Sequence, residues 1–438
     1  MAWFPRSFRA RLSVVAGIAL VVRIAVVLTD WRRTQEPGVT DEGGYQIGAK
    51  LLAQGHGLIN PFIWMFEHRS EPTAGHPPLY TMVLSVPSVL GFDSPLSLRI
   101  FNLLIGVVLV VAVGLLARAL AGDRAALLAA LLASLYPTLW ISDTAIMPET
   151  LYSLLVLLAI GVGYRLWRTP SFGLALSLGA LLSLAALTRS EGLMLFAFVG
   201  LPFVAFAQGV DRARKVRMFA AVLAVGAVLI GAWVGRNLAT FDKPTFMASG
   251  SGHLLANSNC DSTYHGENLG YWSTECGLKK WPKGDESVID VAARKVGVDY
   301  MRENAGRVPT VALARVGRVW GIYRPLQGVD LDAFWERRGL WPSRLALGSF
   351  YLLVVGSIFG LVQLRRRKIL ISPVVGLIVA MTLTIAFSTG ITRYRAPIDA
   401  MLPVLAAVGI DAWWVRRRAA GAAVEGENRS DERASMTP

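Results

Sequence analysis

The stretch LSVVAGIALVVRIAVVL, residues 12–28, is an apolar run interrupted by one cation, Arg23. Three arginines precede it, Arg6, Arg9 and Arg11. This resembles a secretion signal, but the run is long for one and Thr29-Asp30-Trp31 offers no small-residue cleavage site. We therefore interpret 12–28 as a retained first membrane helix with its N-terminus in the cytoplasm. Arg23 is expected to face the helix bundle or to extend toward the membrane surface.

The composition extends this interpretation to the whole chain. Of 438 residues, 54% are hydrophobic and 17% charged, and the mean hydropathy is +0.48, far above that of a soluble globular protein. The net charge of +14 comes from arginine clusters between apolar runs, which indicates the positive-inside pattern rather than nucleic-acid binding. We predict an all-α polytopic membrane protein. Further spans are expected at 100–117, 125–141, 150–167, 171–188, 191–208, 218–238, 343–363, 370–388 and 396–415.

The segment 77–90 decides the topology. It is short for a span and contains Pro77, Pro78 and Pro87. If it does not cross, every later arginine cluster lies on the cytoplasmic side with the N-terminus. We therefore predict a re-entrant or surface-lying segment, about ten spans and cytoplasmic termini.

The same topology divides the chain into parts. We predict an N-terminal transmembrane module (1–238) with a catalytic outer loop (30–98), a small extracytoplasmic domain (239–342), C-terminal helices (343–415) and a disordered cytoplasmic tail (416–438). Helices are expected within the domain at 285–304 and at 308–323, the latter lying at the membrane interface. Cys260 and Cys276 both fall in this domain. A disulfide would close a loop of about 15 residues and contribute roughly 3 kcal/mol, and two free thiols are the alternative.

Several motifs recur at the predicted outer helix ends. They are Val39-Thr40-Asp41-Glu42-Gly43-Gly44-Tyr45, Gly75-His76-Pro77-Pro78-Leu79-Tyr80, Leu98-Arg99-Ile100-Phe101-Asn102, Ser142-Asp143 with Pro148-Glu149, Leu187-Thr188-Arg189-Ser190-Glu191-Gly192 and Arg393-Tyr394-Arg395-Ala396-Pro397. In order and sidedness this set resembles the GT-C glycosyltransferases of the protein O-mannosyltransferase and lipid A aminoarabinose transferase superfamily. The resemblance covers roughly 10–240 and 343–415, and it implies a GT-C helical bundle.

The resemblance implies transfer of a sugar, hexosyl or pentosyl, from a polyprenyl-phosphate carrier to an acceptor hydroxyl on the extracytoplasmic face. Arg393 and Arg395 suit the carrier phosphate, since guanidinium binds phosphate oxygens in a bidentate manner. Tyr45 and Tyr394 belong to the same motifs and are assigned to substrate binding with them. One-step displacement of the phosphate predicts inversion at the anomeric carbon.

Asp41 is the predicted catalytic carboxylate. It would accept the proton of the acceptor hydroxyl, or hold a divalent cation, Mg²⁺ or Mn²⁺, beside the phosphate. Glu42 is the second choice, and capping of a helix is the structural alternative for Asp41. His76 stands where relatives often carry Lys, so it is a departure from the family pattern, with donation to a phosphate or sugar oxygen and a structural role both open.

The remaining charged residues have two interpretations each. Arg99 is either a donor contact or an interfacial anchor. Asp143 and Glu149 either complete a metal or acceptor site or cap the helix that follows. Arg189 and Glu191 either bind substrate or pair with each other.

A transporter or flippase of a lipid-linked sugar is the alternative function. Such proteins commonly have inverted repeats and broken helices at the midplane. The sequence shows neither, and its charges gather at helix ends, which favours an enzyme. The sugar and the acceptor, whether glycan, lipid or protein, are not identified by the sequence.

Overall fold

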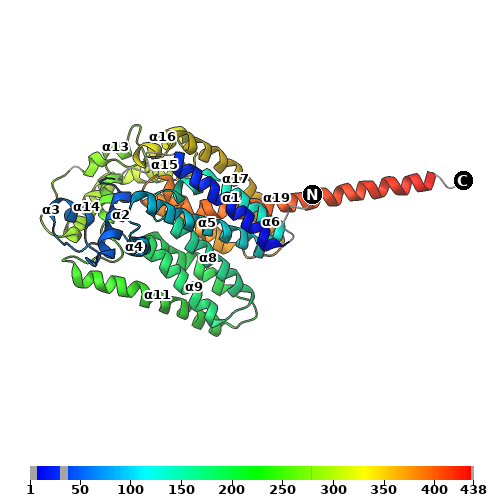
Figure 1. Cartoon of the computed structure of the whole chain (residues 1–438), viewed down its shortest axis with the longest axis horizontal. Coiled ribbons are helices and arrows are strands. Elements are labelled where there is room, and N and C mark those ends of the chain that lie inside the picture. The colour runs from blue at the N-terminus through cyan, green and yellow to red at the C-terminus, as the bar shows by residue number, and fades with distance from the viewer. Residues whose placement is uncertain (1–6, 30–37, 278, 436–438) are drawn as a thin grey trace.

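The computed structural model describes residues 7–29, 38–277 and 279–435, with side chains described as far as residue 418. Within this range the elements are helices, together with one isolated β-bridge between Ile59 and Pro72. Long helices run side by side in a bundle, and helices α2 (Asp41–Ala53), α3 (Pro61–Glu67) and α14 (Glu286–Glu303) gather at one end (Figure 1). We call this the loop end. The predicted all-α polytopic fold is confirmed. Arg6 lies outside the described residues, as do 30–37 of the predicted outer loop.

Six described helices are long and apolar enough to cross a membrane, or seven if one bent pair counts as a span. The six are α1 (Phe8–Thr29), α5 (Pro95–Ala121), α8 (Glu149–Arg168), α11 (Arg212–Thr240), α17 (Leu340–Arg366) and Thr392–Arg418, which enters α19 (Ala396–Ser435). The pair is α6 (Asp123–Leu135) and α7 (Pro137–Asp143), bent by 63°. The other predicted spans are shorter helices, α9 (Phe172–Thr188), Ser190–Ala205 and α18 (Ser372–Phe387). Each predicted span thus coincides with helix. Only six or seven of the described helices are long and apolar enough to cross a membrane, compared with the ten predicted spans.

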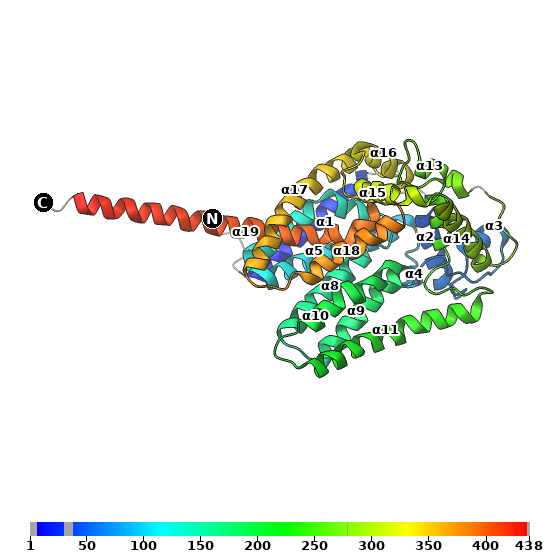
Figure 2. The same cartoon turned by 180° about the vertical axis from the view of Figure 1, so that it is seen from behind.

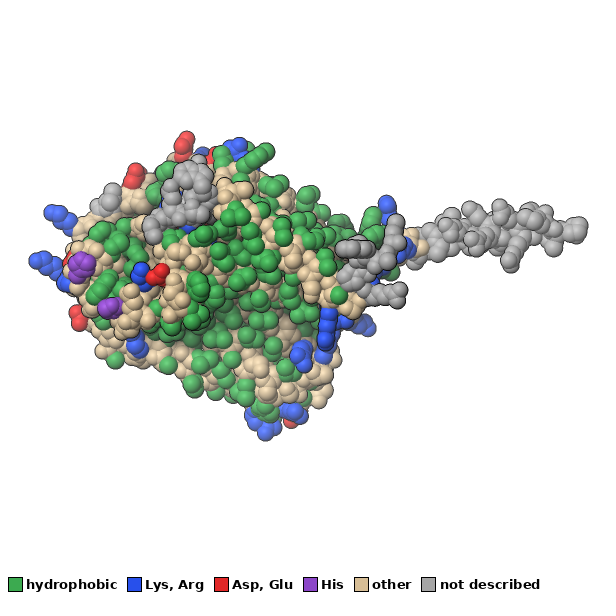
Figure 3. Space-filling model, viewed as in Figure 1, with side chains coloured by type: hydrophobic (Ala, Val, Ile, Leu, Met, Phe, Trp, Pro, Cys, Tyr) green, Lys and Arg blue, Asp and Glu red, His purple; other side chains and the backbone are tan. Residues whose placement is uncertain are grey.

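The helices differ in how much of their surface is covered. In α8 and Thr392–Arg418, 78% of the apolar window is buried, against 22% in α1, α11 and α17. From behind, α11 lies beside α9 at one edge of the bundle and α17 lies at the opposite edge (Figure 2). On the face shown in Figure 3, apolar side chains cover the middle of the molecule. The peripheral helices therefore present the apolar surface that a lipid bilayer requires.

Small residues let the inner helices approach closely. A side chain at Gly360 of α17 would meet the Leu405 carbonyl of α19, and one at Gly376 of α18 would meet the Phe198 carbonyl. Membrane helices pack through such contacts because lipid supplies no hydrophobic driving force between them.

The segment 77–90 forms helix α4 (Leu79–Val89), which begins directly after Pro77-Pro78. Its 11 residues extend about 16 Å, roughly half the apolar thickness of a bilayer. Tyr80 and Leu84 are fully buried, and α4 packs mainly against α2. At this length α4 is not among the described helices that qualify as membrane spans.

The segment between α11 and α17 contains α12 (Ser251–Ser258), α13 (Asp261–Tyr264), α14, α15 (Val308–Val319) and α16 (Pro325–Trp335). The predicted helices at 285–304 and 308–323 correspond to α14 and α15. In α15, however, Arg315 and Arg318 are buried rather than directed to the membrane interface. Their guanidinium groups donate to backbone carbonyls of residues 258, 267 and 269, so α15 holds the loop end together.

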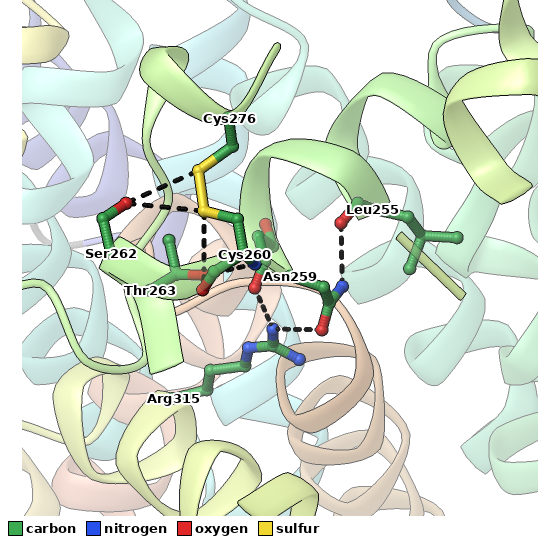
Figure 4. Close-up of a disulfide and its surroundings, with 8 residues drawn as sticks. Leu255, Asn259, Cys260, Ser262, Thr263, Cys276 and Arg315 are labelled. Carbon is green, nitrogen blue, oxygen red and sulfur yellow. Dashed lines mark hydrogen bonds between the residues drawn. A yellow bond between two sulfur atoms is a disulfide. The ribbon is translucent and has the colours of Figure 1, made fainter. Parts of the chain in front are cut away.

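Cys260 and Cys276 form a disulfide, with 6.0 Å between their Cα atoms. Ser262 Oγ lies 3.4 Å from Cys260 Sγ and 3.5 Å from Cys276 Sγ (Figure 4). The neighbouring Asn259 accepts a 3.0 Å hydrogen bond from Arg315. The disulfide is thereby linked to α15 through Asn259 and Arg315.

The C-terminal tail continues helix α19. This helix extends to Ser435 and projects away from the bundle (Figure 1). Residues 436–438 lie outside the described range.

Candidate functional site

Asp41 begins helix α2 at the loop end, but it does not cap it. Thr40 is the N-cap, and its Oγ1 accepts from the Gly43 N–H at 3.3 Å. The Asp41 carboxylate is free to turn to the C-terminal helices, where its Oδ2 accepts from Arg393 Nη1 at 2.9 Å. The capping alternative is therefore replaced by an ion pair between segments 352 residues apart.

The charge state of Asp41 follows from its neighbours. Burial raises the pKa of its carboxyl, but Arg393 and, next, His76 outweigh burial and bring that pKa to about 2. The side chain is 43% exposed, so it remains accessible to a substrate. Asp41 is a fully ionised carboxylate in an open site.

His76 completes one side of this site. Its Nε2 lies 4.0 Å from Asp41 Oδ1, and its ring stacks on Tyr45 at 4.8 Å between centroids. Burial lowers the pKa of His76 below 6.5, an effect that Asp41 opposes and Arg393 reinforces. The imidazole is neutral at pH 7 and can donate or accept a hydrogen bond, but it cannot replace a lysine charge.

Glu42 faces a different partner. Its Oε2 accepts from Arg99 Nη2 at 3.1 Å and its Oε1 accepts from the Ile146 N–H at 3.3 Å. Arg99 is 1% exposed. Glu42 and Arg99 therefore join α2 to the start of α5 and to the loop before α8, away from the Asp41 carboxylate.

The two arginines assigned to the phosphate are separated. Arg395 is buried, with its Nε 3.1 Å from Asp399 Oδ2, its Nη1 donating to the Val319 carbonyl and its guanidinium 3.5 Å from the centroid of the Phe350 ring. In place of the predicted phosphate contact, Arg395 anchors the turn before α19. Arg393 alone reaches Asp41.

A second charged group adjoins the first through Tyr394. Arg189 pairs with Glu149 at 2.6 Å and with Glu191 at 2.5 Å. Its guanidinium lies 4.8 Å from the centroid of the Tyr394 ring, and that of Arg393 lies 5.9 Å from the same centroid. The predicted pairing of Arg189 with Glu191 is present, and it places a second cation beside the Asp41–Arg393 pair.

Asp143 does not join this group. It is fully buried between Arg23, whose Nη2 lies at 2.6 Å, and Thr150, whose Oγ1 donates at 2.8 Å. Asp143 is thus the counterion of the cation in the first span, and Arg23 faces the bundle.

We expect Asp143→Asn to destabilise the protein by about 3 kcal/mol, because it leaves the Arg23 charge buried without a counterion. Thermal unfolding in detergent measures this. The double variant Arg23→Met with Asp143→Leu removes both charges and should recover most of the loss. Equal unfolding temperatures for Asp143→Asn and wild type would contradict this role.

Two residues of the site, Glu336 and Arg338, lie outside the sequence motifs. Glu336 follows α16 and pairs with Arg338, and its Oε1 lies 3.9 Å from Arg393 Nε. The signal in the sequence was the charged run Glu336-Arg337-Arg338 directly before the apolar segment of α17. The site therefore contains the cations Arg189, Arg338 and Arg393, provided by three separate segments.

These residues offer few ligands for a metal. Among the described residues no group of three or more His, Cys, Asp or Glu side chains is placed to hold a cation. Asp41 Oδ2 is already engaged by Arg393. A divalent cation at Asp41 would need its other ligands from substrate and water, so no step below passes through one.

Comparisons with known proteins bear on this arrangement. Residues 75–234 match the family described as dolichyl-phosphate-mannose-protein mannosyltransferase. Among solved structures, the oligosaccharyltransferase AglB of Archaeoglobus fulgidus in complex with an inhibitory peptide and a dolichol-phosphate matches with a TM-score of 0.56 and 16% identity, over 97% of this chain and 52% of that one. The chain has the GT-C glycosyltransferase fold. This confirms the predicted resemblance at the level of the fold.

Two further structures of the Archaeoglobus fulgidus oligosaccharyltransferase share this GT-C fold. The one tethered to an acceptor peptide has a TM-score of 0.56 and 14% identity, over 95% of this chain and 51% of that one. The complex with Zn and sulfate has a TM-score of 0.50 and 15% identity, over 93% and 50%. The GT-C chain described here spans about half the length of these relatives. A comparison with curated proteins gives no significant sequence match.

Proposed function

We propose that this GT-C protein transfers a sugar from a polyprenyl-phosphate carrier to an acceptor hydroxyl, with inversion. The observation that carries the proposal is the pair of Asp41 and Arg393 at the loop end, which places a proton acceptor beside a phosphate-binding cation. The fold and the matched mannosyltransferase family support a lipid-phosphate donor, as does the dolichol-phosphate bound by the archaeal relative. The carrier's chain would lie among the apolar helices, with its phosphate at the headgroup level.

Donor binding would prepare the base. In the donor-free site Arg393 holds the pKa of Asp41 low, which makes the carboxylate a weak base. A donor phosphate competes for the Arg393 guanidinium through bidentate hydrogen bonds. Asp41 is thereby released and its pKa rises toward the value that general-base catalysis needs.

The chemical step then follows. The acceptor oxygen loses its proton to Asp41 and forms a bond to the anomeric carbon from the face opposite the phosphate. The bond between that carbon and the phosphate oxygen breaks, and its electron pair stays on the phosphate beside Arg393. His76 is placed to hydrogen-bond the sugar or acceptor.

The test of the function is sugar transfer by the purified protein in detergent, with polyprenyl-phosphate sugars as donors and a panel of glycan, lipid and peptide acceptors. Detergent leaves no compartment across which to transport. We expect a glycosylated acceptor and free carrier phosphate in equal amounts. A flippase would give neither product, yet would move the donor lipid across sealed vesicles.

The proposed location of the site is the extracytoplasmic face. Arginine clusters lie in the last turns of α8 (Arg165 and Arg168) and α17 (Arg365 and Arg366), the ends of these helices away from the loop end. Arginine in the short connections between spans indicates the cytoplasmic side. We expect a cysteine at Ser94, the N-cap of α5, to react with an impermeant thiol reagent in intact cells, and a cysteine at Arg366, in the last turn of α17, to react only after lysis. The native cysteines are in a disulfide and give no background. Equal protection of both sites would contradict this orientation.

A further inference from the structure

The short connection from α16 to α17 brings a carboxylate against the cation assigned to the phosphate. Glu336 Oε1 lies 3.9 Å from Arg393 Nε, beyond hydrogen-bond distance. Both atoms are buried and have no hydrogen-bond partner within the described chain. Arg393 thus donates a hydrogen bond to Asp41 through Nη1, while its Nε faces Glu336 without forming one.

The position beside Arg393 Nε suits a phosphate better than it suits the Glu336 carboxylate. A phosphate oxygen between Arg393 and Arg338 would satisfy the orphaned Nε and keep a counterion for each guanidinium. Glu336 carries the same sign of charge as that phosphate, so the two repel each other if they share the site. Binding of one disfavours the other.

We infer that Glu336 holds the place of the carrier phosphate in the donor-free site and is displaced from Arg393 and Arg338 when the donor binds. Glu336 is then a positioning residue that sets the affinity for the carrier. The inference rests on the proposed function, because it needs Arg393 as the phosphate ligand.

The surroundings of Glu336 indicate the route by which a carrier phosphate would reach it. Helix α16 exposes Leu326, Phe334 and Trp335, and α17 begins with the exposed Leu340 and Trp341. This apolar surface is continuous in sequence with the exposed face of α17, which runs beside α16 along one edge of the bundle (Figure 1). Side chains of this kind favour the membrane interface. The connection bearing Glu336 therefore lies where a carrier phosphate would arrive from the lipid headgroups.

The competition should depend on pH. The charged groups that face Glu336 are Arg338, Arg393, Asp332 and Glu149. Burial raises the pKa of Glu336 to about 7, although Arg338 and Arg393 oppose the shift. Below that pH the carboxyl is neutral and releases the arginines. Above it the carboxylate competes with the phosphate.

The experiment measures binding of decaprenyl methyl phosphate to the full-length protein in nanodiscs at pH 6 and pH 8. This probe is a phosphodiester like the donor, and its single charge does not change over that range. With a pKa of about 7 for Glu336, the wild type should bind about tenfold more weakly at pH 8 than at pH 6. Glu336→Gln should bind equally at both, at the affinity of wild type at pH 6. The matched control is Asp330→Asn, an exposed carboxylate of α16 that pairs with Arg344, and it should behave as wild type.

The outcomes separate this inference from the proposed function. Equal affinity of Glu336→Gln and wild type at pH 8 overturns the inference, and so does a wild type that binds equally at both pH values, a result that needs no folded variant. Arg393→Gln, measured alongside, should lose binding at both pH values. If it binds as wild type, the phosphate site itself is wrong and the proposed function loses its donor contact.

Discussion

Asp41→Asn should reduce sugar transfer by about 10³-fold, because it removes the proton acceptor while keeping the shape of the side chain. Binding of the carrier lipid should persist, since Arg393 loses a competitor for the phosphate rather than a partner in holding it. The measurement is the transfer rate at saturating donor, together with carrier binding to the same preparation. Thermal unfolding verifies that the variant is folded.

Glu42→Gln is the matched control for this result. It makes the same change of charge one residue along, on a carboxylate that holds Arg99 and the Ile146 N–H instead of facing Arg393. We expect its main effect on stability, with transfer reduced far less than in Asp41→Asn. Near wild-type turnover of Asp41→Asn would show that Asp41 is not the base.

Arg393→Lys should lower the affinity for the carrier by about tenfold while keeping the positive charge. Lysine lacks the planar guanidinium with which arginine binds two phosphate oxygens at once. The measurement is carrier binding in nanodiscs and the KM for the donor. An unchanged affinity would remove Arg393 from the phosphate site.

Arg395→Lys is the companion variant, and the structure predicts a different result for it. Arg395 is buried against Asp399, the Val319 carbonyl and Phe350, so its loss should lower the unfolding temperature more than the affinity for the carrier. A loss of carrier affinity as large as that of Arg393→Lys, without loss of stability, would restore the hypothesis that both arginines bind phosphate.

Much of the fold could be predicted from the sequence because hydrophobicity and proline act locally. Apolar runs located the helices, and the prolines of 77–90 marked a short segment, which forms the 11-residue helix α4. The residues that form α14 and α15 were likewise predicted as helix from their apolar spacing. Span length was less predictable, because inner helices such as α9 and α18 are covered by neighbours and need not match the bilayer by themselves.

The candidate site could be predicted only in part. Motif order selected Asp41, His76, Arg189 and Arg393, and the structure gathers them. It also gives residues that are close in sequence different partners. Glu42 accepts a hydrogen bond from Arg99 and lies away from the Asp41 carboxylate. Arg395 pairs with Asp399, whereas Arg393 pairs with Asp41. Adjacent residues on a helix or tight turn point in different directions, so a charged pair in sequence is seldom a pair in space.

The sequence by itself determined that the chain is a helical membrane protein with its charged motifs at helix ends, because lipid excludes unpaired backbone and charge wherever they occur along a chain. Only the tertiary structure decided which charges meet. Asp41 pairs with Arg393 across 352 residues, Asp143 neutralises Arg23 across 120, and Glu336 enters the site from a segment with no recognised motif. Such pairs depend on how helices distant in sequence pack together, and no local pattern encodes that packing.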